Sequence, residues 1–216
     1  MSEQTTRVIA LRHGETAWNV ASRIQGQRDT ALNEIGRGQA ERVAAALADE
    51  RLDAIYASDL ARAHATAEAV ARVAGLEVQT EPGLRERHFG NFEGLTYAEI
   101  ETRFPEQARR WRQRDASFGP QGGETLAVFA ERAVASITAL AARHRGQHIA
   151  VVTHGGVLDA LYRAAARIAL DAPRTWQIGN ASINRLLASD DGFVLIGWAD
   201  VSHLEVAALD EHGGCA

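Results

Sequence analysis

The sequence predicts an α/β fold, a three-layer α/β/α sandwich in which helices cover both faces of a doubly wound, mostly parallel sheet. Short apolar runs have the length and composition of buried strands. These runs are residues 8–11, 52–57, 76–80 and 148–152. Longer stretches with helical spacing of apolar residues alternate with them. They cover residues 36–48, 60–74, 125–143 and 157–166. Such alternation favours parallel strands, whose carboxyl ends form the ligand-binding edge of the sheet.

The residues that flank these elements indicate where some of them begin. Ser58 and Asp59 follow the second strand and are typical caps for the helix that begins at about residue 60. Two further apolar runs suit a hairpin across the turn-forming residues 189–192. These runs are residues 182–188 and 193–198.

The helix at residues 125–143 carries an apolar stripe that predicts a core-facing surface. The stripe consists of Leu126, Phe129, Ala133, Ile137 and Leu140. Residues 88–123, just before it, are rich in aromatic side chains and interrupted by Pro105, Pro120 and Gly122. We expect this segment to form short helical pieces, within a single domain of residues 1–216.

Composition excludes several classes of function. The 216 residues, 46% of them hydrophobic, suit one domain with a full core. A formal net charge of −5 argues against a nucleic-acid partner, because binding to a phosphate backbone needs a positive surface. No apolar run is long enough to span a membrane, and residues 1–7 are polar. The one cysteine, Cys215, cannot form an internal disulfide, so we expect a cytoplasmic protein.

Arg12-His13-Gly14-Glu15 follows the first predicted strand and is a candidate phosphate site. A neutral imidazole at His13 can attack phosphorus and form a phosphohistidine. The guanidinium of Arg12 offers planar donors to phosphate oxygens, and Gly14 lets the backbone approach the anion closely. Alone, the motif is equally typical of a strand-end histidine that donates to a carbonyl.

Thr153-His154-Gly155-Gly156 repeats this arrangement after the fourth predicted strand. The helix that follows presents unpaired N–H groups and the positive end of its dipole, which together favour anions. A glycine turn with a structural histidine is the alternative. Two such strand ends in one parallel sheet favour a shared anion site. Arg62 lies in the first turn of another predicted helix near the same edge, although a solvated arginine is also typical there.

Four motifs occur in a fixed order along the chain. They are Arg12-His13-Gly14-Glu15-Thr16, then Ser58-Asp59-Leu60-Ala61-Arg62-Ala63 with Thr66-Ala67, then Glu86 with Phe89-Gly90 and Glu93-Gly94, then Thr153-His154-Gly155-Gly156. Together they resemble the phosphoglycerate-mutase-like branch of the histidine phosphatases. The resemblance runs from residue 7 to about residue 198, nearly the whole chain. It implies the same three-layer fold and a phosphoryl-transfer enzyme.

The resemblance also assigns a role to each matching residue. His13 resembles the nucleophile, and Glu86 resembles the acid that protonates the leaving group and contacts the substrate. The residues that resemble the phosphate-binding pocket are Arg12, Asn19, Arg62, His154 and Gly155. Two arginines and an imidazolium at His154 provide positive charge for the transition state, so no metal ion or other cofactor is expected.

The functions that fit this chemistry differ in what meets the phosphohistidine. A phosphatase lets water attack it and so hydrolyses phosphate monoesters of small metabolites. A phosphoglycerate mutase, the first alternative, passes the phosphate to a second hydroxyl. A non-catalytic phospho-ligand binding protein is the second alternative, disfavoured because the reacting residues are all present. A zinc hydrolase that uses His13 and His154 is disfavoured because Arg12 and Arg62 repel a cation.

The segment before the long helix favours a phosphatase over a mutase. Residues 95–124 are compact, and Gln121-Gly122-Gly123-Glu124-Thr125 resembles the matching stretch of broad-specificity phosphatases. The resemblance implies a small phosphorylated metabolite as the partner, covered by a variable segment at about residues 88–123, and it admits a homodimer. Four arginines surround Trp111 and predict either a contact with a second anionic group or a solvated helix face. They are Arg109, Arg110, Arg112 and Arg114.

Overall fold

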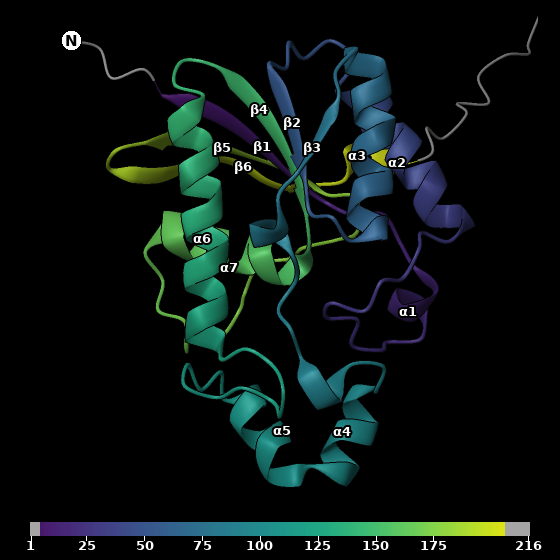
Figure 1. Ribbon diagram of the computed structural model, residues 1–216, viewed down its shortest axis with the longest axis vertical. Helices are drawn as coiled ribbons and strands as arrows, with labels where there is room; N and C mark the ends of the chain where they lie inside the picture. Colours follow the sequence, from purple (N-terminus) through teal and green to yellow (C-terminus); the bar gives the residue numbers. More distant parts are fainter. Residues whose placement is uncertain (1–4, 206–216) are drawn as a thin grey trace, which may run out of the picture.

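The computed structural model describes residues 5–205, in which helices cover both faces of one sheet, as predicted (Figure 1). The six strands have the order β3-β2-β4-β1-β5-β6. The parallel strands are β1 (Thr6–Arg12), β2 (Ala54–Ala57), β3 (Val78–Thr80) and β4 (His148–Thr153). The predicted hairpin is present as β5 (Ile183–Ser189) and β6 (Gly192–Asp200), and β5 runs antiparallel to β1. The prediction of a mostly parallel α/β sheet is confirmed.

Alternate residues of the central strand β1 face opposite helical layers. Val8 and Ala10 lie in the core with α6 (Leu126–Arg143) and α7 (Gly155–Ala166). Ile9 and Leu11 lie in the core with α2 (Glu34–Ala46) and α3 (Ala61–Ala74). Both faces of the sheet are therefore covered, which explains why this strand is an unbroken apolar run in the sequence.

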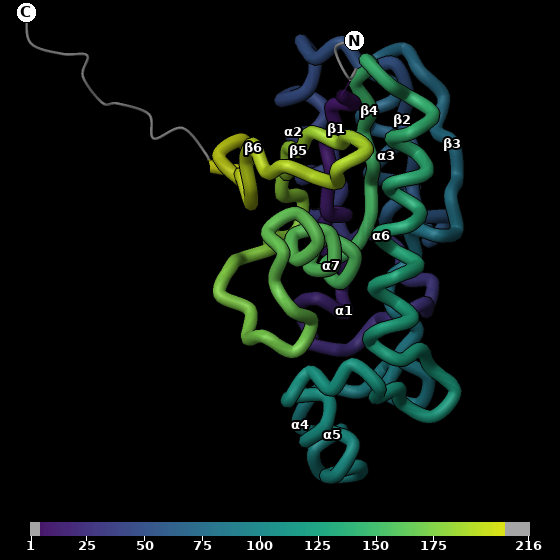
Figure 2. The backbone as a smooth tube through the Cα atoms, turned by 90° about the vertical axis from the view of Figure 1, so that its left-hand side faces the viewer, coloured from purple at the N-terminus to yellow at the C-terminus, as the bar shows by residue number. Residues whose placement is uncertain are grey.

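The predicted stripe of α6 faces this core. Phe129, Ala133, Ile137 and Leu140 are buried, and Leu126 packs partly against them. The same helix lies along one side of the molecule and reaches from the sheet toward the small helices at the other end (Figure 2). One part of α6 therefore packs in the core, and its other end lies near the small helices at the carboxyl ends of the strands.

The structure corrects the predicted cap of α3. The helix begins after Leu60 without a capping side chain of its own, because Asp59 forms an ion pair with Arg85 instead. The N–H of Ala61 donates to Oδ1 of Asp29, a residue distant in sequence, at 2.7 Å. A tertiary contact therefore provides the cap that the sequence assigned to Ser58 and Asp59.

Several element boundaries also differ from the prediction, and the contacts explain two of them. Helix α2 begins two residues before Gly36, because the side chain of Asn33 accepts from the N–H of Gly36 and caps the first turn. The strand expected at residues 76–80 is shortened to Val78–Thr80, because the N–H of Leu76 still bonds to the last turn of α3 through the left-handed Gly75.

Residues 88–123 form a small helical cap at the carboxyl edge of the sheet (Figures 1 and 2). Its elements are the short 3₁₀ helix η2 (Gly90–Phe92), α4 (Tyr97–Arg103) and α5 (Pro105–Arg112). An apolar cluster of its own holds it together, centred on the buried rings of Phe92 and Phe118. The remaining short elements are α1 (Ala17–Val20), η1 (Pro82–Leu84) and η3 (Ser202–Leu204).

No helix within residues 5–205 is long and apolar enough to cross a membrane. Cys215 lies outside the described residues.

Candidate active site

The two predicted strand-end histidines lie side by side. Strands β1 and β4 are parallel neighbours with Arg12 opposite Thr153, so His13 and His154 follow at equivalent positions. The N–H of His13 donates to the carbonyl oxygen of Thr153 at 3.0 Å. The imidazole centroids are 5.2 Å apart and both rings are buried. The carboxyl edge of the sheet therefore brings both histidine motifs into one site.

The ring of His13 is held in the form that a nucleophile needs. Nδ1 lies 2.7 Å from the carbonyl oxygen of Gly14, and because a carbonyl only accepts, Nδ1 carries the proton. The lone pair is then on Nε2. Burial, followed by the charges of Arg62 and Arg12, holds the pKa of His13 well below its usual value near 6.5. The imidazole is thus neutral at neutral pH.

The charges of two guanidinium groups act on this histidine, that of the buried Arg62 and that of the half-buried Arg12, and each group is only partly satisfied by the described residues. Arg12 donates Nη1 to the carbonyl oxygen of Ile178 at 2.6 Å. Arg62 donates to the carbonyl oxygens of Arg28 at 2.9 Å and Gly26 at 2.8 Å. The Nε atoms of Arg12 and Arg62 are buried without any partner among the described residues. Burial lowers the pKa of Arg62 to about 10, which still leaves it charged at neutral pH.

His154 adds two more unpaired nitrogens, since neither Nδ1 nor Nε2 has a partner in the described part of the chain. A buried polar group left without a partner costs about 1–3 kcal/mol, so the cluster with Arg12 and Arg62 has donors that an anion could satisfy. The imidazolium expected for His154 is not what the structure shows. Burial and then the charges of Arg62, His13 and Arg12 lower the pKa of His154 well below 6.5.

The loop after β1 needs a glycine, because another part of the chain passes very close to it. A Cβ on Gly14 would lie 2.4 Å from the carbonyl oxygen of Gly36, at the start of α2. The N–H of Gly14 donates to Oγ1 of Thr66 at 3.1 Å, and that hydroxyl in turn donates to the carbonyl oxygen of Arg62 at 2.8 Å. Thr66 therefore joins the loop after β1 to the first turn of α3.

Glu86 joins the site through its carboxylate. Oε2 accepts from the N–H of Gly156 at 2.9 Å, and Oε1 accepts from the N–H of Arg87 at 2.8 Å. A Cβ on Gly156 would lie 2.1 Å from Oε1, so this position needs glycine for the carboxylate to fit. The neighbouring Gly155 lies beside Arg12, where an added Cβ would be 3.5 Å from Nε.

An open cavity of about 290 Å³ borders Arg12, Glu86 and these two glycines, whereas His13, Arg62 and His154 are not among its wall residues. Residues from the strand ends, the helical cap and the loop after α7 form its walls. The charged and glycine walls are Arg12, Glu86, Arg87, Arg114, Gly155, Gly156, Asp159 and Arg174. The apolar walls are Phe89, Trp111, Leu126, Phe129 and Ile178. Its size suits a small phosphorylated molecule.

The family model that describes the histidine phosphatase superfamily (branch 1) matches residues 8–201 of this sequence. The chain belongs to the histidine phosphatase superfamily. It is 39% identical over 211 residues to phosphoglycerate mutase-like protein 4 of Arabidopsis thaliana, covering 95% of this chain and 90% of that protein. Over 217 residues it is 37% identical to the metal-independent phosphoserine phosphatase of the same plant, covering 99% and 89%.

A solved structure of similar fold is the mycobacterial glucosyl-3-phosphoglycerate phosphatase in complex with VO3. It has a TM-score of 0.80 and 36% identity, covering 89% of this chain and 98% of that one. The protein is therefore an enzyme of the histidine phosphatase type, and its relatives include both phosphatases and mutase-like proteins.

Asn19 of this histidine phosphatase lies in α1 and has a structural role beside its predicted one. Its side-chain oxygen accepts from the N–H and the hydroxyl of Thr16, each at 3.0 Å, and closes a capping box. Asn180 donates to the same oxygen at 3.3 Å and to the carbonyl oxygen of His13 at 3.1 Å. The phosphate contact of Asn19 stays a prediction, for which the amide NH2 is the part of the side chain not used in these bonds.

The arginines around Trp111 divide into two groups in the histidine phosphatase. Arg109, Arg110 and Arg112 form ion pairs with acidic residues on the surface of the cap. Arg114 instead lines the cavity and pairs with Asp159 of α7 at 2.7 Å. The solvated-face alternative therefore holds for Arg109, Arg110 and Arg112, whereas a contact of Arg114 with a second anionic group stays a prediction.

Sequence patterns did not single out three other charged residues of the cavity. They are Arg87, Asp159 and Arg174. Arg174 follows a proline in an irregular loop, and Asp159 has the spacing of an ordinary helix residue, so neither carries a motif. Arg87 directly follows Glu86, which was its only signal. Within residues 5–205, no group of three or more His, Cys, Asp or Glu side chains is placed to hold a metal ion.

Proposed function

We propose that the protein hydrolyses phosphate monoesters of small metabolites through a phosphohistidine on His13. The observation that carries the proposal is the neutral His13 ring, with its lone pair on Nε2, beside two arginines whose buried Nε atoms have no partner among residues 5–205. A tetrahedral anion supplies the acceptors that these donors lack. Phosphatases among the relatives support the same reaction.

In the first step, Nε2 of His13 attacks phosphorus and forms the P–N bond while the bond to the leaving oxygen breaks. Glu86, in its carboxylic acid form, gives its proton to that oxygen, so the alcohol departs neutral. Arg12 and Arg62 stabilise the charge on the equatorial phosphate oxygens. The amide of Asn19 and the ring of His154 complete the pocket. A dianion beside His154 counteracts the neighbouring positive charges and favours its protonated form.

In the second step, water attacks the phosphohistidine and the P–N bond breaks. Glu86, now a carboxylate, takes a proton from that water. Inorganic phosphate leaves and the lone pair returns to Nε2 of His13. Every proton and electron pair is accounted for without a metal ion.

The cavity indicates which phosphate monoesters fit. Arg174 is exposed, lines the cavity and makes no hydrogen bond or ion pair with any residue of the described range 5–205. Arg114 and Arg87 also line it but already bind Asp159 and backbone carbonyls. An acidic group on the leaving part of the substrate therefore finds an unpaired cation at Arg174, in a cavity that the rings of Phe89 and Trp111 also line. A cytoplasmic location and a homodimer remain predictions.

Arg174 also suits the mutase alternative, because a mutase must hold the carboxylate of its acceptor. A single assay separates the two functions. The enzyme is mixed with 3-phosphoglycerate and a trace of 2,3-bisphosphoglycerate, and both 2-phosphoglycerate and free phosphate are followed. A parallel reaction uses p-nitrophenyl phosphate. We expect free phosphate from both substrates and little 2-phosphoglycerate. Fast primer-dependent isomerisation with negligible ester hydrolysis would make the mutase function correct.

A further inference from the structure

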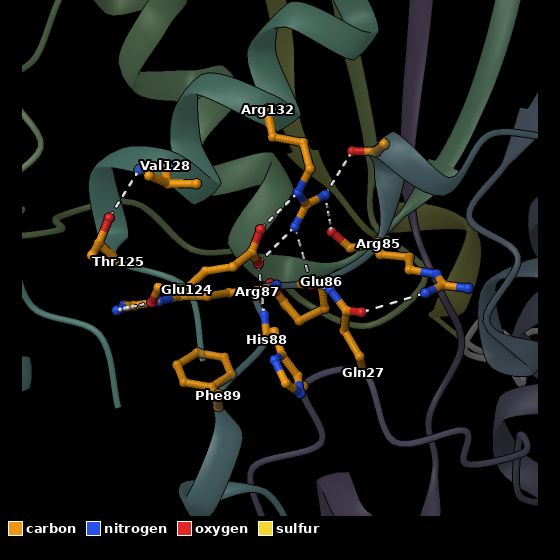
Figure 3. Close-up of polar contacts among 12 residues, drawn as sticks. Gln27, Arg85, Glu86, Arg87, His88, Phe89, Glu124, Thr125, Val128 and Arg132 are labelled. Carbon is orange, nitrogen blue, oxygen red and sulfur yellow. Dashed lines mark hydrogen bonds and ion pairs between the residues drawn. The ribbon is translucent and has the colours of Figure 1, made fainter. Parts of the chain in front are cut away.

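One arginine of α6 holds the backbone that carries Glu86. Nη1 of Arg132 donates to the carbonyl oxygens of Gly83 at 2.9 Å and Arg85 at 3.1 Å. Nη2 lies 3.4 Å from the carbonyl oxygen of Glu86 itself. Carbonyls on either side of one short turn therefore converge on a single guanidinium (Figure 3). A planar fork of this kind fixes several acceptors at once.

The same guanidinium is bound in turn by Glu124. Nε of Arg132 donates to Oε1 at 2.9 Å and Nη2 to Oε2 at 2.8 Å. Oε2 also accepts from the N–H of His88 at 2.8 Å (Figure 3). Burial alone would raise the pKa of Glu124, but the bonds from Arg132 and the N–H of His88 outweigh it and lower that pKa. The pair thus stays ionised. Arg132 bonds to backbone carbonyls up to Glu86, and Glu124 bonds to the N–H of His88 after it.

We propose that Arg132 and Glu124 form a positioning clamp for the acid catalyst, which aligns the carboxylate of Glu86 through its backbone. The inference rests on the proposed role of Glu86 as the acid. Two N–H groups hold the tip of that carboxylate, those of Gly156 and Arg87. The clamp decides whether the carboxylate lies where the leaving oxygen develops charge, and a shift of about 1 Å there costs up to ~10²-fold in rate.

The readout is the dependence of rate on the leaving group. For a series of phosphate monoesters, log kcat/KM is plotted against the pKa of the leaving alcohol. A placed acid flattens this slope, because it neutralises the departing oxygen. Arg132→Lys keeps the positive charge near His154 but loses the planar fork. We expect it to lower kcat/KM for alkyl phosphates about 10-fold more than for p-nitrophenyl phosphate, which steepens the slope.

The matched control is Arg110→Lys. Like Arg132, which pairs with Glu124 and lies over the ring of Phe129, Arg110 pairs with a carboxylate, that of Asp115, and lies over a phenyl ring, that of Phe118. Arg110 donates to no carbonyl near Glu86. Its slope should equal that of the wild type. Glu124→Gln keeps one acceptor oxygen and should steepen the slope in the same direction, so it serves as the second variant if Arg132→Lys does not fold.

Glu86→Gln, measured on the same esters, separates this proposal from the one beneath it. If Glu86→Gln does not steepen the slope, the acid assignment itself is wrong. If Glu86→Gln steepens the slope while folded Arg132→Lys and Glu124→Gln slow all esters equally, the clamp is overturned and the acid assignment survives. A steeper slope in all three, with Arg110→Lys unchanged, supports the clamp.

Discussion

Oε2 of Glu86 accepts a hydrogen bond of 2.9 Å from the N–H of Gly156, in the first turn of the helix that His154 precedes. The candidate acid and the candidate phosphate pocket are therefore joined directly. The two segments lie far apart in the sequence. They meet because β4 ends at the carboxyl edge of the sheet, directly before His154 and Gly156. Because the bond is made to a main-chain N–H of α7, the position of the Glu86 carboxylate relative to the candidate phosphate pocket is fixed by the backbone.

Gly156→Ala tests that contact. The new Cβ would meet Oε1 of Glu86 at 2.1 Å, and because the end of a flexible side chain can move, the fold should survive while the carboxylate shifts. We expect kcat/KM for alkyl phosphates to fall about 10²-fold and that for p-nitrophenyl phosphate less than about 10-fold. Gly38→Ala on α2, where a Cβ meets nothing within 4 Å, is the control and should keep full activity. Equal losses on both esters would show that Gly156 matters only for packing.

Arg174→Met tests the selectivity of the cavity. Because Arg174 has no partner in the described chain, its removal should raise KM for 3-phosphoglycerate about 10-fold and leave glycerol 3-phosphate, which lacks the carboxylate, nearly unchanged. Arg109→Met removes an exposed arginine of α5 that pairs with Glu106, and it should change neither substrate. A similar change in KM for both substrates would contradict a carboxylate contact at Arg174.

The fold and the site were predictable to different depths. Apolar periodicity and two strand-end motifs were sufficient for the layers and for the pairing of His13 with His154, because parallel strands share one carboxyl edge. The residue that caps the N-terminus of helix α3 was not predicted, because Asp29 is distant in sequence and reaches the helix only in the folded chain. The neutral state of His154 was also missed, because its pKa depends on burial and on the combined charge of neighbours from three segments. Arg174 has no local pattern, so only the cavity identifies it.

Stability should fall in mild acid because His13 and His154 resist protonation in the folded protein. Their pKa values lie well below 6.5 when folded and near 6.5 when unfolded. Below about pH 6.5 the unfolded chain binds more protons, so the free energy of unfolding decreases as the pH falls, by up to about 1.4 kcal/mol per pH unit for each ring. Denaturant unfolding between pH 7 and 5.5 measures the slope. His154→Gln should show a shallower slope than the wild type, whereas equal slopes would refute the lowered pKa of His154.

Catalysis should not depend on a divalent metal. Arg12 and Arg62 already place two positive charges beside His13, where a metal ion would otherwise stabilise the transition state. Dialysis against a strong chelator should leave the rate of p-nitrophenyl phosphate hydrolysis unchanged. Activity that disappears on chelation and returns with zinc or magnesium would overturn the proposed pocket.

The central claim is that His13 carries the phosphate, and trapping the phosphoenzyme tests it most directly. The enzyme is mixed with ³²P-labelled substrate, denatured in alkali within milliseconds and analysed for bound label. Phosphohistidine withstands base and hydrolyses in acid, unlike a phosphate ester of serine. We expect stoichiometric, acid-labile label in the wild type and none in His13→Ala, with label retained in His64→Ala, whose ring lies on α3 paired with Glu68. Label that persists in folded His13→Ala would contradict the account.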